Sequence, residues 1–172
     1  MARVSTKENK NIYQLTRESL KLTRESASEL LETISTERIE KIENERSLPY
    51  PDEVLTMAEK YRQPNLCNYY CANQCPIGQE YVPEVKIKDL SQIVLEMLAS
   101  LNAMNKRKDR LIEITADGKI SDDELEDFLY IQEELERISI TVETLQLWAE
   151  KMLAAGVIDE ARYEAYRSRK KT

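Results

Sequence analysis

The 172-residue sequence contains no histidine and only three glycines, one tryptophan and one phenylalanine. The absence of histidine removes the commonest general base, and no Gly-rich phosphate-binding loop is present, so the residues indicate no enzyme. The shortage of glycine argues against a β-barrel or β-sandwich, which needs many turns. Charged residues, by contrast, make up 33% of the chain, and with abundant Glu, Lys, Leu and Ile they predict an all-α protein.

Long apolar runs are also missing. The uncharged apolar stretches are only a few residues long, whereas a membrane-spanning helix needs about 20, and the N-terminal MARVSTKENKN has no apolar signal core. The three cysteines, Cys67, Cys71 and Cys75, are an odd number in one short segment, which fits a reducing compartment better than a disulfide framework. We therefore expect a cytoplasmic protein with no membrane partner.

A net negative charge ordinarily counts against a nucleic-acid partner, and the chain carries −7. That charge is unevenly distributed, because residues 1–62 hold 11 Lys and Arg against 12 Asp and Glu, whereas residues 63–172 hold 14 against 20. The N-terminal part is therefore nearly neutral, and most of the negative charge lies in the rest of the chain.

Residues 22–61 have the spacing of a helix-turn-helix. Three short helices have suitable N-cap residues, and a proline at a first helical position begins a fourth. These residues are Asn11, Thr23, Ser35 and Pro51. Apolar residues at helical spacing are expected to form the core. They are Ala27, Leu30, Leu31 and Ile34 in the second helix and Val54, Leu55, Ala58 and Tyr61 in the fourth.

The third helix, which begins after Ser35, is expected to have an apolar back and a polar front. Ile39 and Ile42 face inward in this pattern. The residues facing outward are Thr36, Glu37, Arg38, Glu40, Lys41 and Asn44. The DNA major groove admits one helix, whose N-terminal residues reach the base edges, so this pattern is what a major-groove reader requires.

A series of short motifs runs through residues 9–62: Leu22-Thr23-Arg24-Glu25, Ile34-Ser35, Ile39-x-x-Ile42-Glu43, Pro49 and Met57-Ala58. In this order they resemble the lambda-repressor-type (XRE) helix-turn-helix family of bacterial and phage regulators. The resemblance implies a five-helix DNA-binding domain that reads the major groove with the helix at residues 36–45. It implies phosphate contact by Arg24, base reading by Thr36, Glu37, Arg38 and Lys41, and further DNA contacts by Ser35, Asn44 and Arg46.

Three positions depart from the family pattern. Where the family usually has Gln, Gly and Gly, this chain has Arg24, Glu32-Thr33 with one extra residue, and Glu45. The third helix and its end also carry four carboxylates, Glu37, Glu40, Glu43 and Glu45. Carboxylates oppose approach to phosphate, so a second interpretation stays open, in which the module is a protein–protein adaptor.

The cysteine segment, residues 66–76, has a thiol at every fourth position. In a helix this spacing places Cys67, Cys71 and Cys75 on one face, where a thiol-based redox or metal sensor could be built. A zinc ion there would need its fourth ligand from a carboxylate, water or a second chain. The alternative is that these small residues pack a short helix against its neighbours, and no bound cofactor is expected.

Residues 76–88 are expected to be a linker, because Gly and Pro occur in residues 76–83 and an extended alternation follows. The linker separates a helix-turn-helix domain at 1–75 from a hairpin domain at 89–172 that ends in a short helix. Two apolar seams at 3.5-residue spacing predict long antiparallel helices. The seams are Leu90, Val94, Met97, Leu101, Met104 and Leu111, then Phe128, Ile131, Leu135, Ile138, Val142, Leu145, Ala149 and Met152.

The turn between the two long helices has two interpretations. Residues 113–124 resemble an EF-hand calcium loop, with Gly118 at the sixth position and Glu124 at the twelfth, although Glu113 and Thr115 replace better ligands. An Asp-Gly turn followed by a capping box of Ser121 and Glu124 explains the same residues.

A lone hairpin leaves apolar residues outside its seams exposed. These are Leu98, Leu125, Leu129, Ile140, Leu147 and Trp148. Packing them on the N-terminal module is one solution; burying them against a second chain gives a four-helix bundle whose twofold symmetry suits paired DNA half-sites. We expect a sequence-specific transcriptional regulator that binds double-stranded DNA and forms a homodimer through residues 89–155.

Overall fold

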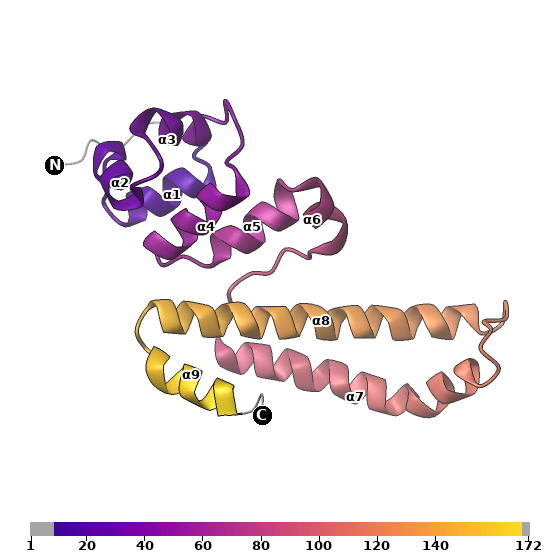
Figure 1. The fold of residues 1–172 in the computed structure, drawn as a ribbon. Coiled ribbons are helices and arrows are strands. Elements are labelled where there is room, and N and C mark those ends of the chain that lie inside the picture. The colour runs from indigo at the N-terminus through magenta and orange to yellow at the C-terminus, as the bar shows by residue number, and fades with distance from the viewer. Residues whose placement is uncertain (1–8, 170–172) are drawn as a thin grey trace. The chain divides into compact units, whose positions relative to one another are not determined.

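The computed structural model describes residues 9–169, and within this range it contains nine α-helices and no β-strand (Figure 1). The prediction of an all-α protein is therefore confirmed for the described part of the chain. The chain divides into two compact units, one formed by Met1–Glu84 with Glu150–Thr172 and the other by Val85–Ala149. None of the described helices is long and apolar enough to cross a membrane.

The first four helices begin where the sequence predicts. They are α1 Ile12–Ser19, α2 Arg24–Leu31, α3 Thr36–Glu43 and α4 Pro51–Lys60. The side chains of Asn11, Thr23 and Ser35 cap the first three, each by accepting a hydrogen bond from the backbone N–H three residues later. The fourth begins at a proline, whose missing N–H would have no partner in a first turn.

Each of these four helices is followed by a residue with positive φ that is not glycine. The residues are Lys21, Glu32, Glu45 and Arg62, with φ of 58°, 61°, 57° and 55°. Glycine is the usual residue after a helix because a Cβ makes this backbone region unfavourable. A chain with three glycines therefore accepts local backbone strain at four helix ends.

One apolar core joins these helices. Its buried members are Tyr13, Ala27, Leu31, Ile34, Ile39, Ile42, Val54, Met57, Ala58, Tyr61 and Leu66. Two predicted core residues lie outside it, because Leu30 is 38% exposed and Leu55 is 62% exposed. In α4 the buried arc runs through Val54, Met57 and Ala58, and the residue after Val54 falls beyond that arc.

Two shorter helices, α5 Asn65–Asn73 and α6 Pro76–Tyr81, follow α4. The first six residues of the expected linker, residues 76–81, form the helix α6. Gly78 allows this helix to pack against α5, because a Cβ at this position would lie 2.1 Å from the Cys71 carbonyl oxygen. Residues 82–89 contain no helix.

The predicted long hairpin is present, and its residues up to Ala149 belong to the second unit. Helices α7 Leu90–Thr115 and α8 Leu125–Ala154 run antiparallel, and α9 Glu160–Arg169 follows (Figure 1). The turn contains Gly118 with φ 71°. The Ser121 N–H and hydroxyl both donate to the Glu124 carboxylate, at 3.0 and 2.5 Å, and α8 begins one residue later. Gly156, with φ 70°, follows the end of α8 as predicted.

Of the predicted seam residues, only Ile131 is among the buried residues of the two helices. The buried residues are Ile93, Ser100 and Ile114 in α7 and Ile131, Glu134, Thr141, Thr144 and Leu147 in α8. Five residues predicted to be inside are 39–50% exposed: Leu90, Val94, Leu101, Leu135 and Val142. Adjacent residues of a helix differ by a rotation of about 100° about its axis. In α7 the column of residues through Ile93 and the column through Val94 are both largely apolar, so spacing alone does not show which column is buried.

Candidate nucleic-acid interface

The turn between α2 and α3 sets the position of the predicted recognition helix. Glu32 has φ 61° and ψ −46°, and the Thr33 N–H donates to the Leu31 carbonyl at 2.6 Å, which is the geometry of a γ-turn. The Ser28 hydroxyl donates to the Ile34 carbonyl at 2.9 Å. The extra residue of this turn is therefore accommodated by a tight, hydrogen-bonded bend.

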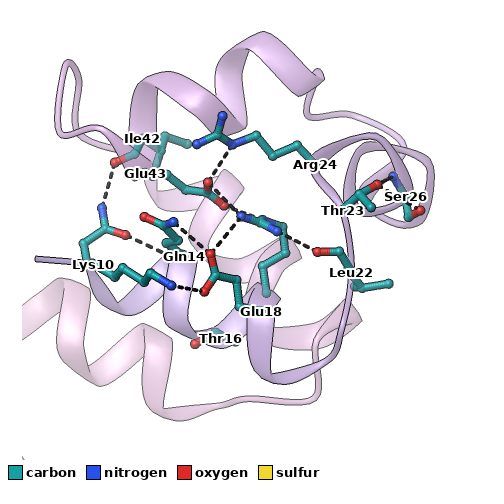
Figure 2. Close-up of polar contacts among 12 residues, drawn as sticks. Lys10, Gln14, Thr16, Glu18, Leu22, Thr23, Arg24, Ser26, Ile42 and Glu43 are labelled. Atoms are coloured by element: carbon teal, nitrogen blue, oxygen red, sulfur yellow. Dashed lines mark hydrogen bonds and ion pairs between the residues drawn. The ribbon is translucent and has the colours of Figure 1, made fainter. Parts of the chain in front are cut away.

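A buried ionic cluster joins α3 to α1 and α2 (Figure 2). The Glu43 carboxylate is 1% exposed and accepts two hydrogen bonds from the Arg17 guanidinium, at 2.5 and 3.0 Å, and one from Arg24 at 2.7 Å. Arg17 also donates to the Leu22 carbonyl at 2.6 Å. Burial would lower the pKa of Arg17, but the hydrogen bonds and charge of Glu43 raise it above its ordinary value, so the guanidinium stays charged.

A second group of polar contacts lies along α1 (Figure 2). Lys10 Nζ donates to the Glu18 carboxylate at 2.7 Å, and Gln14 Nε2 donates to the same carboxylate at 2.9 Å. Asn11 caps α1 with its side-chain oxygen, while its Nδ2 donates to the Ile42 carbonyl of α3 at 2.8 Å. The first helix and its N-cap residue Asn11 therefore contact α3 at two points, the Glu43 carboxylate and the Ile42 carbonyl.

Arg24, expected to contact phosphate, is bonded within the chain to Glu43. Its Nε makes the 2.7 Å contact, and its side chain is 30% exposed. A guanidinium carries four further N–H donors, so the group can hold Glu43 and still present donors outward.

Arg38, expected to read bases, connects α3 to the loop before α4. Its guanidinium donates to both Glu53 carboxylate oxygens at 2.7 Å, to the Ser47 hydroxyl at 2.6 Å and to the Leu48 carbonyl at 2.9 Å. Its carbon Cζ lies 4.8 Å from the centre of the Tyr50 ring. The side chain is 20% exposed, so its main contacts are structural.

Glu53 is held as an anion by the same network. Burial would raise the pKa of this carboxyl, but hydrogen bonds from Arg38 and from the Tyr50 N–H lower it below its ordinary value. Sequence reasoning missed this residue, although its place at the third position of a helix that begins with Pro51 is that of a capping-box glutamate. Arg17 gave no such signal, because its partner lies 26 residues away.

The outward surface of α3 is formed by the remaining predicted contacts. Glu37, Lys41 and Asn44 have the i, i+4, i+7 spacing of one helix face. The Glu37 and Lys41 side chains are 76% and 48% exposed and form an ion pair at 2.8 Å, which lowers the pKa of Glu37. Among the other predicted contacts, Ser35 and Arg46 are exposed, and Thr36 is half-buried, as is Asn44.

The three cysteines do not form a joint site. Cys67 and Cys71 lie on α5, but this helix ends at Asn73, so Cys75 lies outside the helix that would place all three thiols on one face. All three are free, half-buried thiols, and residues 9–169 contain no group of three or more His, Cys, Asp and Glu side chains that could hold a metal ion. Burial raises the pKa of Cys67, which lowers its thiolate fraction and its reactivity.

The calcium-loop interpretation of residues 113–124 has no support in the geometry. The carboxylate of Glu124, the twelfth position, accepts from Ser121, and Asp117 Oδ1 accepts from the Lys119 N–H at 3.0 Å. These are the contacts of a turn and a helix start, and no metal-binding group occurs there within the described range.

Comparison of the chain with protein-family models, curated proteins and solved structures finds no match. The resemblance to the lambda-repressor-type family therefore rests on the motifs of residues 9–62.

Proposed function

We propose that the protein is a sequence-specific transcriptional regulator of the XRE type, which binds double-stranded DNA by placing α3 in the major groove. The observation that carries this proposal is the α2–turn–α3 arrangement, in which Ile39 and Ile42 are buried and the opposite face of α3 is polar. A short helix with a capped N-terminus and a polar outer face has the dimensions and the hydrogen-bonding groups that the groove accepts.

The contacts within the chain assign different roles to the proposed DNA-binding residues. Lys41 can donate to guanine and Glu37 can accept from the cytosine amino group, and both are exposed on α3. Arg38 is a positioning residue in this scheme, because it fixes the loop after α3 through Glu53. The other proposed contacts are Ser35, Thr36 and Asn44 near the bases and Arg24 and Arg46 at the backbone.

The proposal includes a homodimer formed through residues 89–155. Regulators of this kind read two half-sites related by twofold symmetry, and a long antiparallel hairpin offers a surface on which two copies can pair. Pairing also doubles the number of phosphate contacts, which offsets the small charge of each N-terminal module.

A protein–protein adaptor is the alternative, and two observations favour it. Arg24 and Arg38 are both paired with carboxylates of their own chain, which reduces the positive potential that phosphate would meet. Leu48 and Tyr50, in the loop after α3, are 59% and 65% exposed, and exposed large apolar side chains are common in protein interfaces.

Selection from random DNA duplexes at low salt, using the full chain, tests the proposal directly. Enrichment of a common motif, with binding that weakens steeply as salt rises, is the expected result. Recovery of no motif would reject DNA recognition and leave the adaptor as the function of the same surface.

Lys41→Gln separates base reading from general charge effects. We expect this change to relax sequence preference and to reduce the salt dependence by about one unit of slope. The matched control is Lys106→Gln, which removes the same charge from an exposed position of α7. An equal loss in both variants would show that Lys41 contributes only nonspecific charge.

A further inference from the structure

One side of the α7–α8 hairpin exposes apolar residues that the hairpin itself does not cover. On α7 these are Val94, Leu98 and Leu101, which are 42%, 56% and 47% exposed. On α8 they are Leu135 and Val142, which are 50% and 39% exposed. We call these five residues, with the small polar residues beside them, the hairpin face.

The two apolar columns lie on the same side of the hairpin. Val94 and Leu101 each follow a buried residue of α7, Ile93 and Ser100, by one position. Leu135 and Val142 follow buried residues of α8 in the same way, namely Glu134 and Thr141. In an antiparallel pair, a one-residue step past the buried column turns the side chain toward the same side in both helices. The five residues therefore form one continuous surface.

Cross-helix contacts fix which residues are level with one another. Arg110 Nε meets Asp127 Oδ2 at 2.7 Å, and Arg107 lies 4.1 Å from the centre of the Tyr130 ring. The same register brings Leu98 level with Ser139, which is the middle of the hairpin face. Leu101 then lies near Leu135, and Val94 near Val142, on either side of that middle.

The hairpin face carries no charge in a chain in which 33% of residues are charged. Beside its apolar centre, the exposed positions on the same columns are mostly uncharged polar residues, Ser91 and Asn105 on α7 and Gln132, Ser139 and Gln146 on α8, while Lys108 and Glu136 lie at its border. Depletion of charge around an apolar centre is the composition of a protein interface core.

The order of residues along the face is the same in both directions. Going outward from Leu98 and Ser139, the next residues are apolar in both directions, and the residues after them are serine, asparagine or glutamine. A twofold axis through the middle would therefore bring apolar residues against apolar residues and amides or hydroxyls against groups that can both donate and accept. We propose that the partner of the hairpin face is the hairpin face of a second copy of this chain.

This inference rests on the homodimer of the proposed function and names the surface that forms it. It differs from the arrangement expected from the sequence, because Leu147 is 5% exposed and is already covered, whereas Val94, Leu101, Leu135 and Val142 are exposed. The paired hairpins form a four-helix bundle in which these four residues, predicted to lie inside one hairpin, lie between the two chains.

Sedimentation equilibrium of the full chain, without DNA, tests the inference. We expect a dimer at micromolar concentration, and we expect Leu98→Glu to weaken dimerisation at least about 100-fold, because it buries a charge at the centre of the interface. The control is Ala99→Glu, which places the same charge on the same helix at an exposed residue that helical spacing turns away from Val94, Leu98 and Leu101. This control should leave the dimer unchanged.

Two results would overturn the inference: a monomeric wild-type chain up to about 100 µM, or equal dimerisation of the Leu98→Glu and Ala99→Glu variants. Circular dichroism confirms that each variant is helical, and Leu98→Gln replaces the glutamate variant where helicity is lost. DNA binding is measured separately, so a monomer that still selects a DNA motif would reject the hairpin face while leaving DNA recognition in place.

Discussion

Removal of the Glu43 charge tests the reasoning on the buried ionic cluster most severely. Glu43→Gln keeps the shape of the side chain but leaves the Arg17 guanidinium, which is 6% exposed, without its hydrogen-bonded anionic partner; the Glu18 carboxylate, at 3.8 Å, is the other anion beside it. Removing one member of a buried ion pair costs about 3–5 kcal/mol, because the remaining charge is neither paired nor hydrated. Arg24 adds less to this cost, because its side chain is 30% exposed and can be hydrated.

The expected loss is localised to the first unit. Native-state hydrogen exchange, read on peptides from α1 and α3, should show opening constants larger by about 100-fold to several thousand-fold, which corresponds to 3–5 kcal/mol at about 1.4 kcal/mol per factor of ten. Peptides from α7 and α8 belong to the other unit up to Ala149 and serve as the internal reference. Their exchange should not change.

Two further variants make the interpretation specific. Glu37→Gln removes a carboxylate whose side chain is 76% exposed, and we expect a change of less than about 0.5 kcal/mol. The double variant Arg17→Met with Glu43→Leu removes both buried charges, and it should recover much of the stability lost in Glu43→Gln. A Glu43→Gln protein within about 0.5 kcal/mol of wild type would refute the claim that this cluster is buried and tightly paired.

Three other predictions follow from the same structure. Glu45→Gly should stabilise the first unit by about 0.5–1 kcal/mol in urea unfolding. The φ of 57° at this residue strains the Cβ, and glycine removes that strain at some cost in backbone entropy. Glu45→Ala keeps the Cβ, so this control variant should not stabilise the unit. Gly78→Ala should destabilise the packing of α6 by at least about 1 kcal/mol, because the new Cβ would meet the Cys71 carbonyl, whereas Gly118→Ala has open space around it and would show backbone strain only. The free energy of unfolding should be highest above the ordinary glutamate pKa and should fall as the pH drops through the lowered pKa values of Glu18 and Glu53. Glu53→Gln should flatten this pH dependence. An unchanged pH profile in this variant would contradict the lowered pKa of Glu53.

The starts of the first helices could be predicted from sequence because capping is a local effect. Asn11, Thr23 and Ser35 each bond a backbone N–H only three residues away, so the residue type and the spacing contain the whole interaction. The positions of Arg17 and Arg38 could not be predicted in this way. Their carboxylate partners lie 26 and 15 residues away, and only the folded chain brings them together.

The hairpin shows a different limit of sequence reasoning. A heptad pattern with one apolar column identifies a buried stripe, but α7 has apolar residues at both Ile93 and Val94, one position apart. Ser100 and Thr141 then occupy buried positions that spacing would assign to Leu101 and Val142. The error in the seams is informative, because a second apolar column beside the buried one is what a helix needs in order to pack on two neighbours.

Two of the three arginines that the family resemblance implies as DNA contacts also fix the position of α3. Arg24 shares the Glu43 carboxylate with Arg17, and Arg38 holds Glu53, so each anchors one end of the segment that contains α3. A helix fixed at both ends loses little conformational freedom on binding, which favours recognition by a few exposed side chains. In the proposed complex, sequence preference therefore depends on Glu37 and Lys41, and a change at Arg38 alters DNA binding by moving the loop after α3.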